Sequence, residues 1–306
     1  MVSGSMKESL QRESVGNPPV IDGERIASSC VCCGSRDLES SAAVLMPFIA
    51  HRVFNWAPVF IDESWGLRTL KTGLAYSICN TLRCRNCSLL FLDLRFSDAE
   101  LSRLYQDYRG EAYNALREHY EPGWLQRCRF YDKPVAYLPQ IEAFLEPHLN
   151  GAIRVLDWGG DSGSNTPFQG RCECCDIYDI SGKPVVPGAR QVGLDEAQSN
   201  DYSLIVCSNV LEHVSQPAAL LAEIRQAMRP QTLLYLEVPH ETLMREQSSP
   251  PAAAKRHWHE HVNFFSTDSL RALLQACRLE LLEMRNIEAD AGASGAHQLQ
   301  IACRLA

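Results

Sequence analysis

Residues 153–163 constrain the fold of this 306-residue chain more than any other stretch. They read Ile-Arg-Val-Leu-Asp-Trp-Gly-Gly-Asp-Ser-Gly, an apolar run that ends in an acidic residue and is followed at once by a glycine-bearing turn. The apolar run predicts a buried parallel strand. A carboxylate and backbone N–H groups then lie at the carboxyl end of that strand, where open α/β sheets bind ligands, and glycine lets the backbone approach a ligand closely. The spacing is neither G-x-G-x-x-G nor a Walker-type Gly-Lys-Ser/Thr loop.

Strand and helix patterns alternate along the chain after the turn at Asn150-Gly151, which favours an α/β sheet. We predict strands at 153–157, 173–180, 190–194, 202–208, 232–238, 279–287 and 297–304. We predict helices at 164–169, 216–228 and 267–277, and Ser266 supplies N-cap chemistry for the last one.

The N-terminal half has a different character. It begins with a polar, Ser/Gly/Glu/Pro-rich stretch, continues with two cysteine pairs, and then turns helical at a Ser97–Glu100 capping box. We therefore expect four parts: a disordered tail (1–26), a zinc-binding module with an insertion (27–95), a helical linker or lid (96–150) and an α/β domain (151–306). The Ser/Pro/Ala-rich stretch 247–254 predicts a mobile loop.

The stretch from Asp157 to Gly163 resembles motif I of the class I S-adenosylmethionine (SAM) methyltransferases, a strand followed by Asp-x-Gly-x-Gly-x-Gly. One departure is visible, because Asp161 stands where the middle glycine is usual. The resemblance implies a Rossmann-like sheet with helices on both faces and SAM bound at this turn.

Further stretches extend that resemblance over residues 150–304. The second predicted strand ends in Asp179, and a carboxylate there suits ribose hydroxyls. Residues 201–214 are similar to the D-x-h-h-h-x-x-x-h-L-E-H-h signature of small-molecule SAM methyltransferases, and 233–240 match the fifth strand. The resemblance implies cofactor-binding roles for Asp157, Gly159, Gly160, Gly163, Asp179, Asp195 and Asn209.

Two C-x2-C pairs, separated by fifty residues, point to a metal site. We expect Cys30, Cys33, Cys84 and Cys87 to hold one structural Zn²⁺, with Cys32 as a spare thiol. Buried cysteines without a metal are the alternative, and a redox role is disfavoured because no thioredoxin-like βαβ pattern surrounds either pair. Thirteen cysteines without an export signal do not predict a disulfide framework.

Residues 257–261 concentrate three histidines and a carboxylate after the fifth strand. Glu260-His261 followed by Phe265 resembles the Glu-His-x-x-x-Phe segment of zinc-containing sugar C-methyltransferases, which act on nucleotide-linked deoxysugars. That branch combines a four-cysteine zinc domain with a SAM domain, and its histidine is thought to act as the base. That branch usually carries a further C-terminal domain, whereas this sequence stops at Ala306, and we therefore expect a hydroxyl, amine or sugar of another metabolite to be an equally good acceptor.

Methyl transfer needs a positioned nucleophile and a group that takes its proton, a role that suits histidine. We expect His261 to be the base, Glu260 to orient it, and His213 to be the next candidate. Tyr105, Tyr108, Tyr113 and Tyr120 form either a lid over the acceptor or a packing surface between domains. His257 and His261 do not form an H-E-x-x-H motif, and we expect no metal there.

Composition limits the remaining functions. A net charge of −8 argues against general nucleic-acid binding, and no apolar run reaches the ~18 residues of a membrane span. Residues 1–19 lack the apolar core of a secretory signal, so we expect a cytoplasmic protein with a small-molecule substrate, and we leave a homodimer open. The competing hypothesis is a SAM-fold or zinc-module interaction protein without catalysis, for which Asp161 is the only support.

Overall fold

A computed structural model describes residues 25–66, 70–128, 134–245, 254–289 and 296–306. The first half contains β1 (Leu38–Leu45), α1 (Pro47–Phe54), β2 (Val59–Ile61), η1 (Glu63–Trp65), β3 (Gly73–Ala75), β4 (Ile78–Cys84), β5 (Leu90–Leu92), α2 (Asp98–Tyr105), α3 (Glu111–Tyr120), α4 (Trp124–Cys128), α5 (Leu138–Leu145) and η2 (Glu146–His148). The second half contains β6 (Arg154–Trp158), β7 (Cys174–Tyr178), β8 (Arg190–Gln191), α6 (Leu194–Ser199), β9 (Leu204–Ser208), α7 (Pro217–Ala227), β10 (Leu233–Pro239), α8 (Thr242–Arg245), β11 (His257–Trp258), β12 (Asn263–Phe264), α10 (Thr267–Ala276), β13 (Leu279–Ala289) and β14 (Ala296–Leu305).

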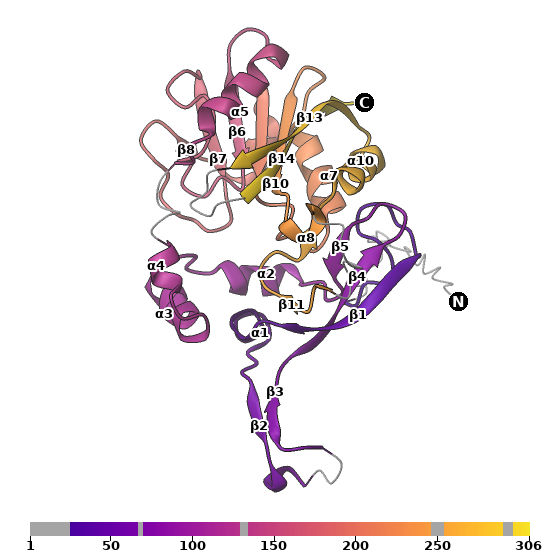
Figure 1. The fold of residues 1–306 in the computed structure, drawn as a ribbon. Coiled ribbons are helices and arrows are strands. Elements are labelled where there is room, and N and C mark those ends of the chain that lie inside the picture. Colours follow the sequence, from indigo (N-terminus) through magenta and orange to yellow (C-terminus); the bar gives the residue numbers. More distant parts are fainter. Residues whose placement is uncertain (1–24, 67–69, 129–133, 246–253, 290–295) are drawn as a thin grey trace, which may run out of the picture.

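The larger sheet has seven strands in the order β13-β14-β10-β9-β6-β7-β8 (Figure 1). Strands β10, β9, β6, β7 and β8 are parallel, whereas β14 runs antiparallel to β10 and β13 antiparallel to β14. The parallel strands place their carboxyl ends along one edge, as ligand-binding α/β sheets require. The predicted Rossmann-like fold is therefore confirmed.

Both faces of this sheet are covered by helices. Side chains alternate along each strand, so Leu156 and Leu234 pack with α7 and α10, while Val155 and Leu233 pack with α5. Helix α7 buries Leu221, Ile224 and Ala227, which lie three residues apart and form one helical face. The two cores fix the sheet from opposite sides.

A second sheet, in the order β11-β1-β4-β5-β12, joins segments that are distant in the chain. β11 pairs in parallel with β1 and β12 antiparallel with β5, so residues 257–264 complete a sheet begun by residues 38–92. Trp258 and Phe264 share a core with Phe48 of α1. The β2–β3 hairpin lies within the predicted insertion and projects away from both sheets (Figure 1).

The capping predictions are confirmed at both helices. Ser97 accepts a bond from the Glu100 N–H, and Glu100 reaches back to the Ser97 N–H at 2.9 Å. Ser266 caps α10 through a reciprocal pair with Ser269. These caps explain why both helices begin where the sequence predicts.

Three element predictions need correction. No helix forms at 164–169, because Pro167 disfavours helical geometry at the residue before it and Phe168 has a φ of 62°. The strand predicted at 190–194 stops at Gln191, and Leu194 instead begins α6, a helix that the sequence pattern did not predict. Arg25 and Ile26, assigned to the tail, pair with Arg95 and Leu94.

Residues 1–24, the rest of the predicted tail, and residues 247–253 of the predicted mobile loop lie outside the described residues. Among the described residues, no helix is long and apolar enough to cross a membrane.

Candidate functional site

The glycine turn after β6 packs tightly against neighbouring strands. Gly159 has a φ of 81°, and its N–H donates to the Tyr178 carbonyl at 2.7 Å. A Cβ on Gly159 would lie 2.6 Å from Val210 Cγ2, and one on Gly163 (φ 80°) would lie 2.9 Å from Ile177 Cδ1. Only glycine fits both positions without displacing a neighbour.

Asp157, at the penultimate position of β6, lies directly under this turn. Its Oδ2 accepts the Thr166 hydroxyl at 2.6 Å, and a Cβ on Gly160 would lie 2.6 Å from its Cγ. Burial raises the pKa of Asp157 to about 7, with Asp179 adding to the rise. The structure thus brings Asp157, Gly159, Gly160 and Gly163 together, as the motif predicts.

Asp179 follows β7 and joins the same turn. Its Oδ2 accepts the Asp161 N–H at 2.9 Å and its Oδ1 accepts the Ser181 N–H at 2.7 Å. Asp161 has a φ of 52°, a left-handed conformation that glycine adopts more easily, and its carboxylate lies 2.8 Å from Lys183 Nζ. Each Asp179 oxygen has a second lone pair, which leaves acceptor capacity for a ribose hydroxyl.

The loop after β9 adds further polar groups to those that follow β6 and β7. Asn209 has a φ of 55°, and its side-chain Nδ2 donates to Ser208 Oγ at 3.0 Å and to the buried Glu237 Oε1 at 3.2 Å. Its neighbour Val210 is the residue that contacts Gly159. Asp195 stands apart, exposed in the first turn of α6.

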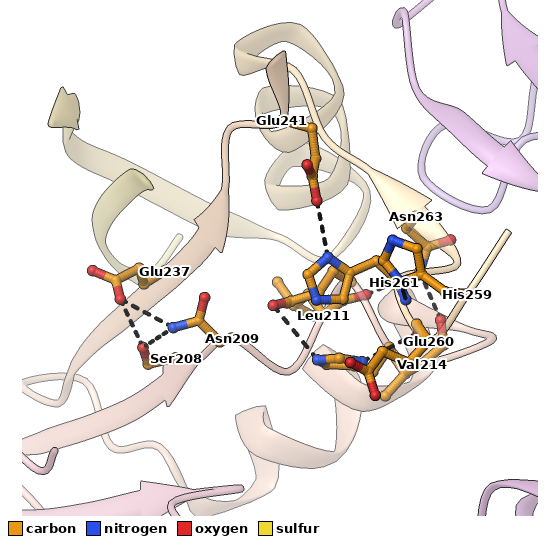
Figure 2. A network of polar contacts seen from close by, with 12 residues as sticks. Ser208, Asn209, Leu211, Val214, Glu237, Glu241, His259, Glu260, His261 and Asn263 are labelled. Carbon is orange, nitrogen blue, oxygen red and sulfur yellow. Dashed lines mark hydrogen bonds and ion pairs between the residues drawn. The ribbon is translucent and has the colours of Figure 1, made fainter. Parts of the chain in front are cut away.

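A cluster of histidines and carboxylates lies where the loop after β9 meets residues 259–261 (Figure 2). The N–H groups of Val262 and Asn263 both donate to the Glu212 carbonyl, at 2.7 and 3.1 Å, which fixes the two segments against each other. The rings of His213 and His261 are nearly perpendicular, with centroids 4.7 Å apart. Glu212 Oε1 lies 3.8 Å from His213 Nε2.

The prediction that Glu260 orients His261 is not what the contacts show. Glu260 is held by Arg117 of α3, with Nη1–Oε2 and Nη2–Oε1 distances of 3.0 and 3.1 Å. His261 Nδ1 is instead 2.9 Å from Oε1 of Glu241, the residue before α8. Neither Glu241 nor Arg117 was predicted from the sequence, although the position of Glu241 just beyond a strand end was a usable signal.

The pKa values of His213 and His261 are shifted in opposite directions. Burial, together with the neighbouring His261, lowers the pKa of His213 to about 3. Burial alone would lower the pKa of His261, but the Glu241 hydrogen bond and the charge of Glu212 outweigh it and raise that pKa above its usual value. His261 is therefore the stronger proton acceptor of the pair.

The pKa values of Glu212 and Glu260 are also shifted in opposite directions. Burial raises the pKa of Glu212 to about 7, and neither of its side-chain oxygens has a hydrogen-bond partner among the described residues. Burial also acts to raise the pKa of Glu260, but Arg117 outweighs it and holds that pKa at about 2. One carboxyl can thus carry a proton near neutral pH while the other stays ionised.

Two tyrosines of the helical linker contact this cluster. The Tyr105 hydroxyl lies 2.8 Å from His213 Nδ1, and the Tyr113 hydroxyl donates to Glu260 Oε2 at 3.4 Å. Tyr108 packs edge-on against both rings, whereas Tyr120 bonds to His51 of α1. A cavity of about 300 Å³ between α2 and the loop after β7 has Tyr105 and Ser181 in its wall, and so adjoins both the cluster and the loop that Asp179 begins.

The four cysteines predicted as zinc ligands lie together, with all four Sγ atoms within 4.8 Å of one another. The Cys30–Cys87 and Cys33–Cys84 Sγ distances are both 3.5 Å, close to the ~3.7 Å edge of a tetrahedron with ~2.3 Å Zn–S bonds. Each pair forms the same turn: the N–H four residues after the first cysteine donates to its carbonyl at 2.9 Å. The donor set and spacing fit Zn²⁺.

The ligand atoms of Glu212, His213 and His261 also lie within 4.8 Å of one another. Three protein ligands are the number that an open metal site has, so the expectation of no metal here stays a prediction.

Comparison with known proteins gives a family match. A family model described as "Methyltransferase domain" matches residues 124–284. Similar solved structures include the glycopeptide N-methyltransferase MtfA (12% identity, 56% of this chain and 91% of that chain covered, TM-score 0.42). Another is the Burkholderia thailandensis 1,6-didemethyltoxoflavin-N1-methyltransferase (15% identity, 81% and 98% covered, TM-score 0.46). No curated protein sequence matches the chain.

Proposed function

The chain belongs to this methyltransferase-domain family, with the class I SAM-dependent fold, and from that premise we propose that it methylates a small-molecule acceptor with His261 as general base. The acceptor class we favour is a sugar, a nucleotide-linked sugar or a secondary metabolite. The observation that carries the proposal is the position of His261, which is largely buried and packs against His213 of the loop that follows β9.

The proposed cofactor site consists of the turn from Asp157 to Gly163, Asp179 and the loop at Asn209. The glycines let the backbone of the turn approach a ligand closely, and Asp179 offers carboxylate oxygens for the ribose hydroxyls. SAM supplies an electrophilic methyl group on a sulfonium when it is bound. Asp195 lies on the same edge of the sheet and is proposed to flank the adenine.

The chain's own part in the reaction is to position the acceptor and take its proton. Val210 touches Gly159, and Glu212 and His213 follow in the same loop, so this loop joins the proposed methyl donor site to the cluster in which His213 contacts His261. His261 Nε2 would take the proton that the acceptor atom loses when it is methylated. His213 has too low a pKa to compete for that proton.

We also propose that Cys30, Cys33, Cys84 and Cys87 hold a structural zinc ion. A four-thiolate site is closed to substrate, so the metal would stabilise the second sheet rather than take part in methyl transfer. The linker helices α2 and α3 are proposed to cover the acceptor, because Tyr105 and Arg117 both bond to the cluster.

Exchange of His261 for alanine tests the base. His261→Ala should leave SAM affinity nearly unchanged and slow methyl transfer by roughly 10²–10⁴-fold, the usual contribution of a positioned base. Transfer of a labelled methyl group from SAM into a mixture of nucleotide sugars and metabolites provides the measurement. Transfer at the wild-type rate would place the base elsewhere.

The observation that favours a non-catalytic alternative is Asp161. Its backbone is in a conformation that glycine prefers, and its N–H already occupies one oxygen of Asp179. Calorimetric titration with SAM separates the two functions, because a scaffold that has lost its cofactor site gives no binding heat.

A further inference from the structure

We propose that Glu241 is a positioning residue for His261, and that it fixes the proton of the imidazole on Nδ1 so that Nε2 faces the acceptor. This inference rests on the proposed function in one respect only, the use of His261 as the base. The two residues come from different parts of the fold, and their contact is therefore a product of tertiary structure.

The contact has the geometry of a carboxylate–imidazole pair. Glu241 Oε1 and His261 Nδ1 are 2.9 Å apart, and Figure 2 shows the carboxylate pointing directly at the ring. A carboxylate only accepts hydrogen bonds, so the proton of a neutral imidazole must be on Nδ1. The side chains are 27% and 23% exposed, which leaves the pair partly screened from solvent.

The backbone around Glu241 is held on two sides. The N–H of His240 donates to the His297 carbonyl of β14 at 2.9 Å, and the Glu241 carbonyl accepts the N–H groups of Met244 and Arg245 as α8 begins. Glu241 is therefore placed by the end of β10, by β14 and by α8 together. A side chain so placed can hold a ring in one orientation.

The backbone around His261 is held by other elements. Val262 donates to the Glu212 carbonyl, and Asn263 belongs to β12 of the second sheet. The Glu241–His261 bond therefore joins the two sheets at the proposed active site. The partner of His261 in this contact, Glu241, lies outside the predicted Glu-His-x-x-x-Phe segment.

Several charged groups face His261, and all of them bear on its proton. Glu212 and His213 approach from the loop after β9, and Glu260 and His259 from its own segment. Arg117 neutralises Glu260, while Lys255 lies near Glu241. Glu241 is the one carboxylate in hydrogen-bond contact with the ring among the described residues, and so it alone selects the tautomer.

Nitrogen NMR of histidine-labelled protein tests the inference without any acceptor. In protein labelled with ¹⁵N-histidine, the wild-type signals that disappear in His261→Ala are those of His261. We expect the neutral form of His261 to carry its proton on Nδ1. In Glu241→Gln, whose amide oxygen can still accept from Nδ1, the tautomer should persist while the His261 titration midpoint moves to lower pH. In Glu241→Ala the tautomer preference should weaken as well.

A matched control is the exposed pair His148–Glu283, whose Nε2–Oε2 distance is 3.1 Å. Glu283→Gln should shift only the His148 signal. A His261 titration unchanged by Glu241→Gln, or a neutral His261 protonated on Nε2 in the wild-type protein, would overturn the inference. Failure of the protein to bind SAM would instead overturn the proposed function and leave the NMR result standing.

Discussion

The close approach of Gly159 to Val210 predicts a specific cost for adding one methyl group. In Gly159→Ala the new Cβ would lie 2.6 Å from Val210 Cγ2, at a residue whose φ is 81°. The left-handed backbone costs roughly 1–2 kcal/mol for a non-glycine residue. Overpacking adds typically about 1–3 kcal/mol. We therefore expect Gly159→Ala to lower the free energy of unfolding by about 2–5 kcal/mol and to weaken SAM binding.

Gly170 provides the matched control, because it has a φ of 86° and no atom of the described residues lies within 4 Å of an added Cβ. Gly170→Ala should lose only the backbone part, roughly 1–2 kcal/mol. Adding Val210→Ala to Gly159→Ala should remove most of the excess, because the clashing methyl is gone. Denaturant unfolding measures all the variants. If Gly159→Ala costs no more than Gly170→Ala, the close packing of turn and loop does not exist.

The zinc site and the buried Glu212 give two further predictions. Metal analysis of protein purified without added zinc should find about one equivalent, and Cys84→Ser should lose it and unfold the second sheet; well-folded, metal-free wild-type protein would exclude the site. Glu212 has its folded pKa raised to about 7, so its carboxyl favours the folded state below the unfolded pKa and loses that contribution as pH rises through 7. Glu212→Gln, which stays neutral, should therefore gain stability relative to wild type between pH 5 and pH 8, by at most about 3 kcal/mol. An equal difference at both pH values would mean that Glu212 is not perturbed.

The sheet and its glycine turn could be predicted from sequence because their signals are local. A strand, an acidic residue and a turn follow one another within eleven residues, and parallel strands bring Asp157 and Asp179 to one edge by geometry alone. The two cysteine pairs were equally readable, because each forms its own turn.

The partners of the histidine segment could not be predicted in this way. Residues 257–264 leave the larger sheet to pair with β1 and β5, more than 150 residues earlier in the chain. That crossing puts Glu260 against Arg117 and His261 against Glu241, and neither contact has a local pattern. The spacing of residues along the chain indicates which side chains are candidates for the site. Their hydrogen-bond partners depend on how the two sheets pack against each other.

Calorimetric titration of the purified protein with SAM tests the central claim most directly. We expect saturable binding at one site per chain, weakened in Asp179→Ala by about 1.5–3 kcal/mol, the range for a charge-assisted hydrogen bond. That corresponds to a loss of roughly 10- to 150-fold in affinity. Absence of SAM binding by the folded, zinc-loaded wild-type protein would contradict the proposed function.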